Sequence, residues 1–387
     1  MNIAILGYGV VGAGVHSIAA SKNLGIDVVR VLDLRQIAEI APLLTTQIDD
    51  ILCDPSIDCI VETMGGLQSA LLFVTRALRA GKHVVTSNKE LISHGLVPLL
   101  IGAQNNGVQL RFSASVGGGI PWLPTLLRQK RADTLLSVKG IVNGTTNYIL
   151  DAMHHGASFS QALVSAQRLG YAEADATDDL IGNDAKRKCA ISASLAFDTL
   201  VETSQIPTLG IAGIQPCDIE AFQAHQLTCK LMMYAERFDG HVCAYVEPML
   251  LTADEIAAHT PTNHNCISLC GEHTGHLTLV GQGAGRFPTA ENVIQDVLDI
   301  QQGLAGPFYL QNTLPVQNDQ EIHAYYIRTS AKELLEGRIS ASFGAGVCTR
   351  PMRVTTLHAL AGRILQEDPD AFFAAMPPEE TAGHTSR

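Results

Sequence analysis

The sequence has no C-x-x-C pair, and its nine cysteines are odd in number and scattered through apolar surroundings. Such a set excludes a complete disulfide framework, so we expect reduced thiols and a cytoplasmic location. No apolar run approaches the ~18 to 20 residues that a bilayer-spanning helix needs, and Met1 leads into a strand-like segment rather than a signal peptide. We therefore expect no membrane partner.

Basic residues are scarce as well. Lys and Arg total 26 against 38 Asp and Glu, which gives a formal net charge of −12. This balance repels nucleic acid phosphates and anionic lipid surfaces, so we expect small molecules rather than nucleic acid as partners. Hydrophobic residues make up 46% of the 387-residue chain, which is enough for sizeable cores in two or three domains.

A glycine turn stands between the first expected strand and the first expected helix. The apolar run of residues 2–6 stops at Gly7, Gly9 and Gly12, and a helical pattern follows. In a G-x-G-x-x-G turn the missing Cβ atoms let the backbone approach a pyrophosphate, and the helix N-terminus supplies N–H donors. The pattern predicts a dinucleotide site. The alternative is a glycine turn that merely packs tightly.

Asp33 directly follows the second expected strand, residues 28–32. A carboxylate at this position suits the adenosine ribose hydroxyls and repels a 2′-phosphate, so it favours NAD over NADP. Arg35 could instead hold that phosphate, because a guanidinium binds phosphate well. Asp33 could also be an ordinary turn or helix cap residue.

Strand-like and helical segments alternate along the first part of the chain. After Asp33, strand-like runs at residues 59–61, 83–86 and 110–112 surround a helical pattern at 71–78. This alternation predicts an α/β fold, a Rossmann-type doubly wound parallel sheet. Beyond about residue 117, strand-like runs at 138–142, 243–247, 266–270 and 276–280 predict a second, α+β domain.

An acidic segment follows a long helical pattern at residues 158–169. Its carboxylates crowd into twelve positions and are Glu173, Asp175, Asp178, Asp179 and Asp184. On a helix Lys188 is the i,i+4 neighbour of Asp184, so an ammonium and a carboxylate could point together into a cleft. A substrate with its own ammonium would neutralise the remaining acids. The alternative is a solvated acidic turn followed by an ordinary surface ion pair.

Five further motifs occur between residue 1 and about residue 302. They are Gly81-Lys-His-Val-Val-Thr-Ser-Asn-Lys89, Ala114-Ser-Val-Gly-Gly-Gly-Ile-Pro121, Gly140-Ile-Val-Asn-Gly-Thr-Thr-Asn-Tyr148, the segment 170–188, and Gly281-Gln-Gly-Ala-Gly-Arg-Phe-Pro-Thr289. With the glycine turn, these motifs resemble homoserine dehydrogenase. The acidic segment is highly specific to that family, whereas the glycine turn alone is a weak signal.

The resemblance implies an NAD(P)-dependent oxidoreductase that reversibly reduces L-aspartate 4-semialdehyde to L-homoserine, in the branch toward threonine, methionine and isoleucine. It implies a homodimer with a nucleotide-binding domain of residues 1–116 and 283–302, and a substrate-binding and dimerisation domain of residues 117–282. Residues 303–387 would form a C-terminal extension, which could be a degenerate form of the regulatory βαββαβ domain that ends many relatives.

The resemblance also assigns roles by matching position. Lys188 is similar to the family's acid/base at the substrate oxygen, Asp184 lies beside it in the catalytic group, and Lys89 is similar to the second active-site lysine. The implied substrate ligands are Glu173, Asp179 and Asp184. The implied cofactor contacts are Gly7, Gly9, Val10, Val11, Gly12, Asp33, Lys89, Gly170, Gly283 and Gly285. A sodium-type monovalent cation would be held by the main-chain oxygens of Ser113, Val116, Gly118 and Ile120.

Two positions depart from the family's pattern. Ser113 stands where relatives often have Glu, which removes a charge beside the expected cation, and Leu32 stands where many have an arginine for a 2′-phosphate, which favours NAD. Two other functions remain open. One is a non-catalytic NAD(P)-binding regulatory relative, against which the costly pair of Asp184 and Lys188 argues, and the other is a dehydrogenase of another small amino-aldehyde.

Overall fold

The computed structural model describes residues 1–306, 310 and 314–378. The chain divides into two compact units, each described by itself below. Unit 1 comprises Met1–Val138, Arg187–Thr203 and Ile267–Leu314, and unit 2 comprises Lys139–Lys186, Ser204–Cys266 and Pro315–Arg387. The nine cysteines all lie in the described residues and are free thiols.

Unit 1 contains a six-stranded sheet in which every neighbouring pair is parallel. Its strands are β1 (Asn2–Leu6), β2 (Asp27–Leu32), β3 (Leu44–Thr45), β4 (Cys59–Glu62), β5 (His83–Thr86) and β6 (Leu110–Arg111). The order across the sheet is β3-β2-β1-β4-β5-β6. This is the strand order of a doubly wound dinucleotide-binding fold, so the predicted fold class is confirmed.

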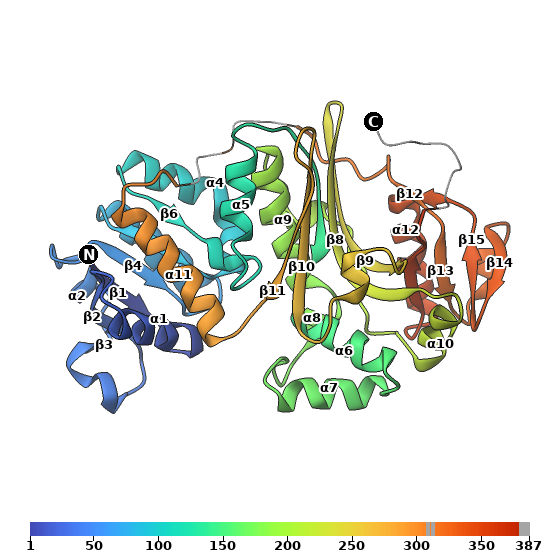
Figure 1. Cartoon of the computed structure of the whole chain (residues 1–387), viewed down its shortest axis with the longest axis horizontal. Helices are drawn as coiled ribbons and strands as arrows, with labels where there is room; N and C mark the ends of the chain where they lie inside the picture. The colour runs from blue at the N-terminus through green and yellow to red at the C-terminus, as the bar shows by residue number, and fades with distance from the viewer. Residues whose placement is uncertain (307–309, 311–313, 379–387) are drawn as a thin grey trace. The chain divides into compact units, whose positions relative to one another are not determined.

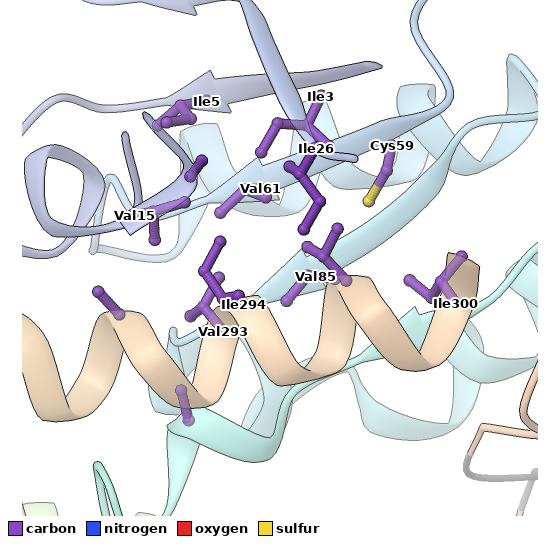
Figure 2. Packing of buried hydrophobic residues seen from close by; sticks show 14 of the residues in the cluster. Ile3, Ile5, Val15, Ile26, Cys59, Val61, Val85, Val293, Ile294 and Ile300 are labelled. Atoms are coloured by element: carbon purple, nitrogen blue, oxygen red, sulfur yellow. The ribbon is translucent and has the colours of Figure 1, made fainter. Parts of the chain in front are cut away.

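The helices of unit 1 that contact this sheet are α1 (Val10–Ser21), α3 (Gln68–Arg79), α4 (Lys89–Asn105) and α11 (Arg286–Gln301). Unit 1 also contains α2 (Asp49–Leu52) and α5 (Trp122–Gln129). Helices α1 and α11 pack against each other, and Figure 2 shows Val293, Ile294 and Ile300 of α11 among Ile3 and Val61 of the strands. Because α11 begins 285 residues into the chain, a late segment completes the core on this face of the sheet.

Unit 2 combines helices with long antiparallel strands (Figure 1). Its helices are α6 (Gly144–His154), α7 (Phe159–Arg168), α8 (Thr177–Leu180), α10 (Pro216–Ala224) and α12 (Val354–Glu367). Strands β8 (Thr228–Phe238) and β9 (His241–Leu251) form an antiparallel hairpin. Three elements contain residues of both units: α9 (Asn183–Phe197), β7 (Leu135–Ile141) and β10 (His264–Gly271). Strand β11 (Gly275–Gln282) belongs to unit 1. The predicted α+β character of the second part is confirmed.

The C-terminal part of unit 2 has a split βαββαβ order with one helix missing. Its elements are β12 (Ile322–His323), β13 (Tyr325–Arg328), a 3-10 turn (Lys332–Leu335), β14 (Ile339–Phe343), β15 (Gly346–Thr349), β16 (Met352–Arg353), α12 and β17 (Phe372–Ala375). Strands β17-β13-β15-β14 are neighbours in that order and antiparallel. The single turn therefore stands where the first helix of such a unit would be, and α12 packs on β13 and β17.

None of the helices in the described ranges is long and apolar enough to cross a membrane.

Candidate active site

The three glycines of the first turn are needed for different reasons. A Cβ on Gly12 would overlap the carbonyl oxygen of Gly7, and a Cβ on Gly7, where φ is +88°, would lie 2.8 Å from Met64 Cα. A Cβ on Gly9 would meet no protein atom within 4 Å. Packing thus explains Gly7 and Gly12, whereas the space at Gly9 is open to a ligand.

The glycine turn lies where the winding of the sheet reverses. It follows β1, whose neighbour on one side is β2 and on the other β4, and Thr63 Oγ1 donates to the Gly7 carbonyl at 2.7 Å. Helix α1 begins with Gly9 as its N-cap, which has no side chain to accept from the first-turn N–H groups. Val10, two-thirds exposed, and Val11 follow. Open N–H groups at such a switch point suit a pyrophosphate.

Asp33 is tied to the glycine turn and to Arg35. Its carboxylate accepts hydrogen bonds from the backbone N–H of Tyr8 at 2.8 Å and from Nε and Nη2 of Arg35 at 2.9 and 2.7 Å. Hydrogen bonding from the Arg35 side chain holds the pKa of Asp33 well below its usual range. The Arg35 side chain is 62% exposed. The carboxylate is therefore ionised and fixed, and the arginine beside it faces solvent.

Lys89 is positioned by a buried polar network at the ends of β4 and β5. Thr86 Oγ1 donates to the buried Glu62 carboxylate at 2.5 Å and accepts from the Asn88 backbone N–H at 2.9 Å. Asn88 caps α4 by accepting from Leu91 N–H, and Lys89 is the first residue of that helix. Burial raises the pKa of Glu62. The motif's Thr86 and Asn88 thus position the backbone from which Lys89 extends.

The late glycine loop lies against two other segments of unit 1. A Cβ on Gly118 would overlap the carbonyl of Gly283, and a Cβ on Gly14 of α1 would lie 2.8 Å from the carbonyl oxygen of Arg286. Gly285, with φ of +128°, is the N-cap of α11. This geometry brings the two predicted late cofactor residues, Gly283 and Gly285, to the loop before α5 and to the side of α1.

The predicted cation ligands lie in one short stretch of unit 1 that contacts α11. Ser113 N–H and Oγ donate to the fully buried carboxylate of Asp296, at 2.8 and 2.6 Å. The carbonyls of Gly118 and Ile120 accept from Nδ2 of Asn292, at 2.8 and 3.3 Å. Val116 is buried between these positions. Neither α11 residue was among the sequence candidates, because both lie more than 170 positions from their partners.

In unit 2, one asparagine joins two of the predicted substrate acids. Asn143 Nδ2 donates to Asp179 Oδ1 at 2.7 Å and to Asp184 Oδ2 at 2.8 Å. Asn143 is itself fixed as the N-cap of α6, where its Oδ1 accepts from Thr146 N–H at 2.8 Å. Asp179 comes from α8 and Asp184 from the first turn of α9. The acidic segment is therefore folded back on the turn between β7 and α6.

Asp184 and Lys188 lie four residues apart on α9, and both side chains are buried. Residues at this spacing share one face of a helix, so a carboxylate and an ammonium are placed together away from bulk water. Glu173 is exposed, and its carboxylate makes no hydrogen bond to any described residue. Gly170, with φ of +75°, ends the turn after α7 and is required there for its backbone conformation.

The remaining polar residues of the Gly140–Tyr148 motif serve the fold. Thr145 Oγ1 donates to the carbonyl of Tyr171 at 2.6 Å, and Asn147 Nδ2 donates to three carbonyls of residues 260–264. The ammonium of Lys230, on β8, donates to Asn147 Oδ1 at 2.8 Å. Asn143, which holds the two acids, is the functional candidate of the motif. Its position as the expected cap before α6 was the sequence feature that could have identified it.

Trp122 is fully buried in unit 1, and its indole N–H donates to Ser192 Oγ.

Comparison with protein families gives two matches that together cover most of unit 1 and part of unit 2. The model described as homoserine dehydrogenase matches residues 121–298, and the model described as homoserine dehydrogenase, NAD binding domain, matches residues 7–113. The gap between the two matches, residues 114–120, contains three of the four predicted cation ligands. The second match contains the glycine turn, Asp33 and Lys89.

Individual relatives carry the same description. The chain is 34% identical over 357 residues to a homoserine dehydrogenase of Bacillus subtilis, covering 86% of this chain and 82% of that protein. It is 39% identical to one of Corynebacterium glutamicum, covering 77% and 71%. A solved homoserine dehydrogenase from Thiobacillus denitrificans aligns with a TM-score of 0.86 at 28% identity, covering 97% of this chain and 98% of that one. The chain therefore belongs to the homoserine dehydrogenase family of oxidoreductases and has its NAD-binding domain.

Proposed function

We propose that this enzyme reversibly reduces L-aspartate 4-semialdehyde to L-homoserine, with Lys188 as the acid/base. The observation that supports this proposal most directly is that Asp184 and Lys188 are both buried and lie four residues apart on α9, with Asp184 held by Asn143. A buried ammonium next to a fixed carboxylate is costly, and a proton-transfer site is a reason to keep it.

The roles of Lys188 and Asp184 follow from the negative charge that forms on the substrate oxygen when the aldehyde is reduced. When held at the glycine turn, a nicotinamide cofactor would supply the hydride that the aldehyde carbon accepts, and the electrons of the C=O double bond would then move to the oxygen. The Lys188 ammonium stabilises this oxygen anion and donates a proton to it, so that an O–H bond forms as an N–H bond breaks. In the reverse direction the neutral amine accepts the hydroxyl proton. Asp184 orients Lys188 and favours its charged form.

Two further acids of the segment match the substrate's own charge. Aspartate semialdehyde and homoserine both carry an ammonium, and Asp179 and Glu173 supply carboxylates to bind it. Glu173 is suited to this because its carboxylate makes no hydrogen bond to any described residue. Lys89, the first residue of α4, supplies a positive charge for the cofactor and the reacting groups.

For the cofactor, we propose the contacts at Gly7, Gly9, Val10, Val11, Gly12, Asp33, Gly170, Gly283 and Gly285, and a preference for NAD. The preference is supported by the ionised Asp33, which lies at the end of β2 and would repel a 2′-phosphate. Arg35 reduces that repulsion, because it neutralises the carboxylate through two hydrogen bonds. The discrimination between the cofactors is therefore modest.

The assembly and location of the enzyme are also proposals. We expect a cytoplasmic homodimer with residues 1–116 and 283–302 as the nucleotide domain and 117–282 as the substrate and dimerisation domain. The packing of α11 on α1 supports a nucleotide domain built from two chain segments. For residues 303–387, the antiparallel order β17-β13-β15-β14 supports descent from a regulatory βαββαβ domain that has lost its first helix.

The test is the formation of NADH or NADPH by the purified protein with L-homoserine, set against a panel of other small amino-alcohols. The account predicts turnover that is fastest with L-homoserine and faster with NAD than with NADP. Faster turnover of another amino-alcohol would favour the dehydrogenase of a different amino-aldehyde. Tight cofactor binding with no turnover at all would favour a regulatory relative. Neither alternative is favoured by the relatives described above.

A further inference from the structure

One side-chain amide reaches the stretch of main chain where the resemblance places a monovalent cation. Asn292 lies in α11, is only 3% exposed, and directs Nδ2 at the carbonyl oxygens of Gly118 and Ile120, at 2.8 and 3.3 Å. These oxygens are two of the four expected ligands. A cation held by main-chain oxygens needs these oxygens to point at one common position. For Gly118 O and Ile120 O, the group at that position is the N–H₂ of Asn292.

The orientation of this amide is set by its partners. Carbonyl oxygens only accept hydrogen bonds, so the atom between them is the nitrogen and not the oxygen of the side chain. Its two hydrogens match the two acceptors. Ile120 O also accepts from the backbone N–H of Trp122 at 2.7 Å, so both of its lone pairs are used. A cation could bind Ile120 O only by displacing one of these donors.

The same stretch is held from a second point of α11. Asp296, one helical turn beyond Asn292 and on the same face, accepts from Ser113 N–H and Oγ. Asn292 and Asp296 therefore fix both ends of the segment from residue 113 to residue 120 with hydrogen bonds from the protein. Displacing the amide would leave a buried polar group without its partners, which is unfavourable.

We propose that the amide of Asn292 takes the place of the monovalent cation in this chain, so that the 113–120 segment is ordered without a bound ion. The partial positive charge on the two amide hydrogens replaces the ion at Gly118 O and Ile120 O. The departure at Ser113, where relatives often carry a charge, is consistent with a site that no longer has an ion to balance. The inference concerns the ion alone and does not depend on the identity of the substrate.

The experiment compares the wild type with Asn292→Ala, and uses Gln295→Ala as the matched control. Gln295 lies on the same helix, but its side chain is exposed and bonds only to Glu291 among the described residues. Thermal unfolding is measured in sodium, potassium and tetramethylammonium chloride at equal ionic strength. Binding of sodium is measured directly by ²³Na NMR line broadening.

The wild type and Gln295→Ala are expected to unfold at the same temperature in all three salts and to give no specific ²³Na broadening. Asn292→Ala is expected to be less stable in tetramethylammonium chloride and to gain about 3 °C in sodium or potassium, as a newly opened ion site fills. Saturable sodium binding by the wild type would overturn the proposal, and this arm stands even if the variant does not fold. No ion response in the folded Asn292→Ala protein would overturn it as well.

Discussion

The side-chain amide of Asn143 donates a hydrogen bond of 2.8 Å to the carboxylate of Asp184. The two residues are 41 positions apart, and Asn143 is in turn fixed as the N-cap of α6. The capping geometry of one helix thus positions the acid at the start of another. Because Asp184 shares a face of α9 with Lys188, a small displacement of Asn143 would change the position of the proposed proton-transfer group.

Asn143→Ala is expected to lower kcat/KM for L-homoserine about 10- to 100-fold, the effect of losing a hydrogen bond to a buried carboxylate. It will also destabilise the fold, because the cap of α6 is lost. Ser158→Ala is the matched control, since Ser158 caps α7 in the same unit and does not contact the acids. The control should lose about 1 kcal/mol of stability with unchanged kinetics. Equal kinetics in both variants would remove Asn143 from the site.

Gly9→Ala and Gly12→Ala separate ligand space from packing space. At Gly9 no protein atom opposes a Cβ, and φ is −81°, so the variant should keep the wild-type unfolding temperature. Its Kd for NADH and NADPH should rise at least about tenfold, because the new methyl group occupies the pyrophosphate side of the turn. Gly12→Ala should lose about 2 kcal/mol or more of stability. Normal cofactor binding by Gly9→Ala, followed by nucleotide fluorescence, would contradict the predicted site.

Arg35→Ala tests how the cofactors are discriminated. Without the guanidinium, the ionised Asp33 would face a 2′-phosphate uncompensated, and the added repulsion would raise the preference for NADH over NADPH about tenfold. The readout is the ratio of the two kcat/KM values. Arg35→Lys, which keeps the charge, should change the ratio less. If Arg35→Ala instead lowered the ratio, Arg35 would not act by neutralising Asp33.

A partly buried acidic cluster in unit 2 predicts a pH-dependent stability. Burial, followed by the charges of Glu236 and Glu247, raises the pKa of Glu321 from the ordinary 4.5 to about 7. His323 Nε2 lies 3.6 Å from Glu321 Oε2, and burial lowers the pKa of this histidine. A carboxyl with a raised folded-state pKa stabilises the fold fully below its unfolded value and loses that contribution as the pH rises through about 7.

Glu321→Gln should therefore unfold with a free energy that changes less between pH 5 and pH 8 than that of the wild type, the difference being about 2 kcal/mol. The measurement is chemical denaturation across this pH range. Glu336→Gln, at an exposed position of the same C-terminal part, is the control. Parallel pH profiles for Glu321→Gln and the wild type would show that Glu321 is not protonated in the folded state.

The elements of the nucleotide-binding sheet could be predicted closely from local patterns. Strands at residues 2–6 and 83–86 occur with the predicted limits, since both are short apolar runs closed by turn-forming residues. In unit 2, β8 was missed because its sequence contains Lys230 and two adjacent methionines and lacks a regular alternation. Strand β14 was missed because it is an edge strand with four exposed residues, so no apolar pattern marks it.

The sequence predicted which residues belong to the candidate site, but not which distant residues hold them in place. The sequence places Asp184 and Lys188 at helical spacing, and that relationship holds because it is local to α9. The partners that hold the site are distant in the chain. Asn143 reaches Asp179 and Asp184, and Asn292 reaches Gly118, through contacts that arise only when separate elements pack together. No periodicity in one segment could specify them.

The central claim is that Lys188 transfers the proton to the substrate oxygen. Its most direct test is the initial rate of NADH and NADPH oxidation with aspartate 4-semialdehyde for the wild type, Lys188→Ala and the control Lys186→Ala, which lies on another face of α9. The account predicts a loss of about 10³-fold or more in kcat for Lys188→Ala alone, with cofactor binding retained. A Lys188→Ala enzyme that keeps a rate within about tenfold of the wild type would contradict it.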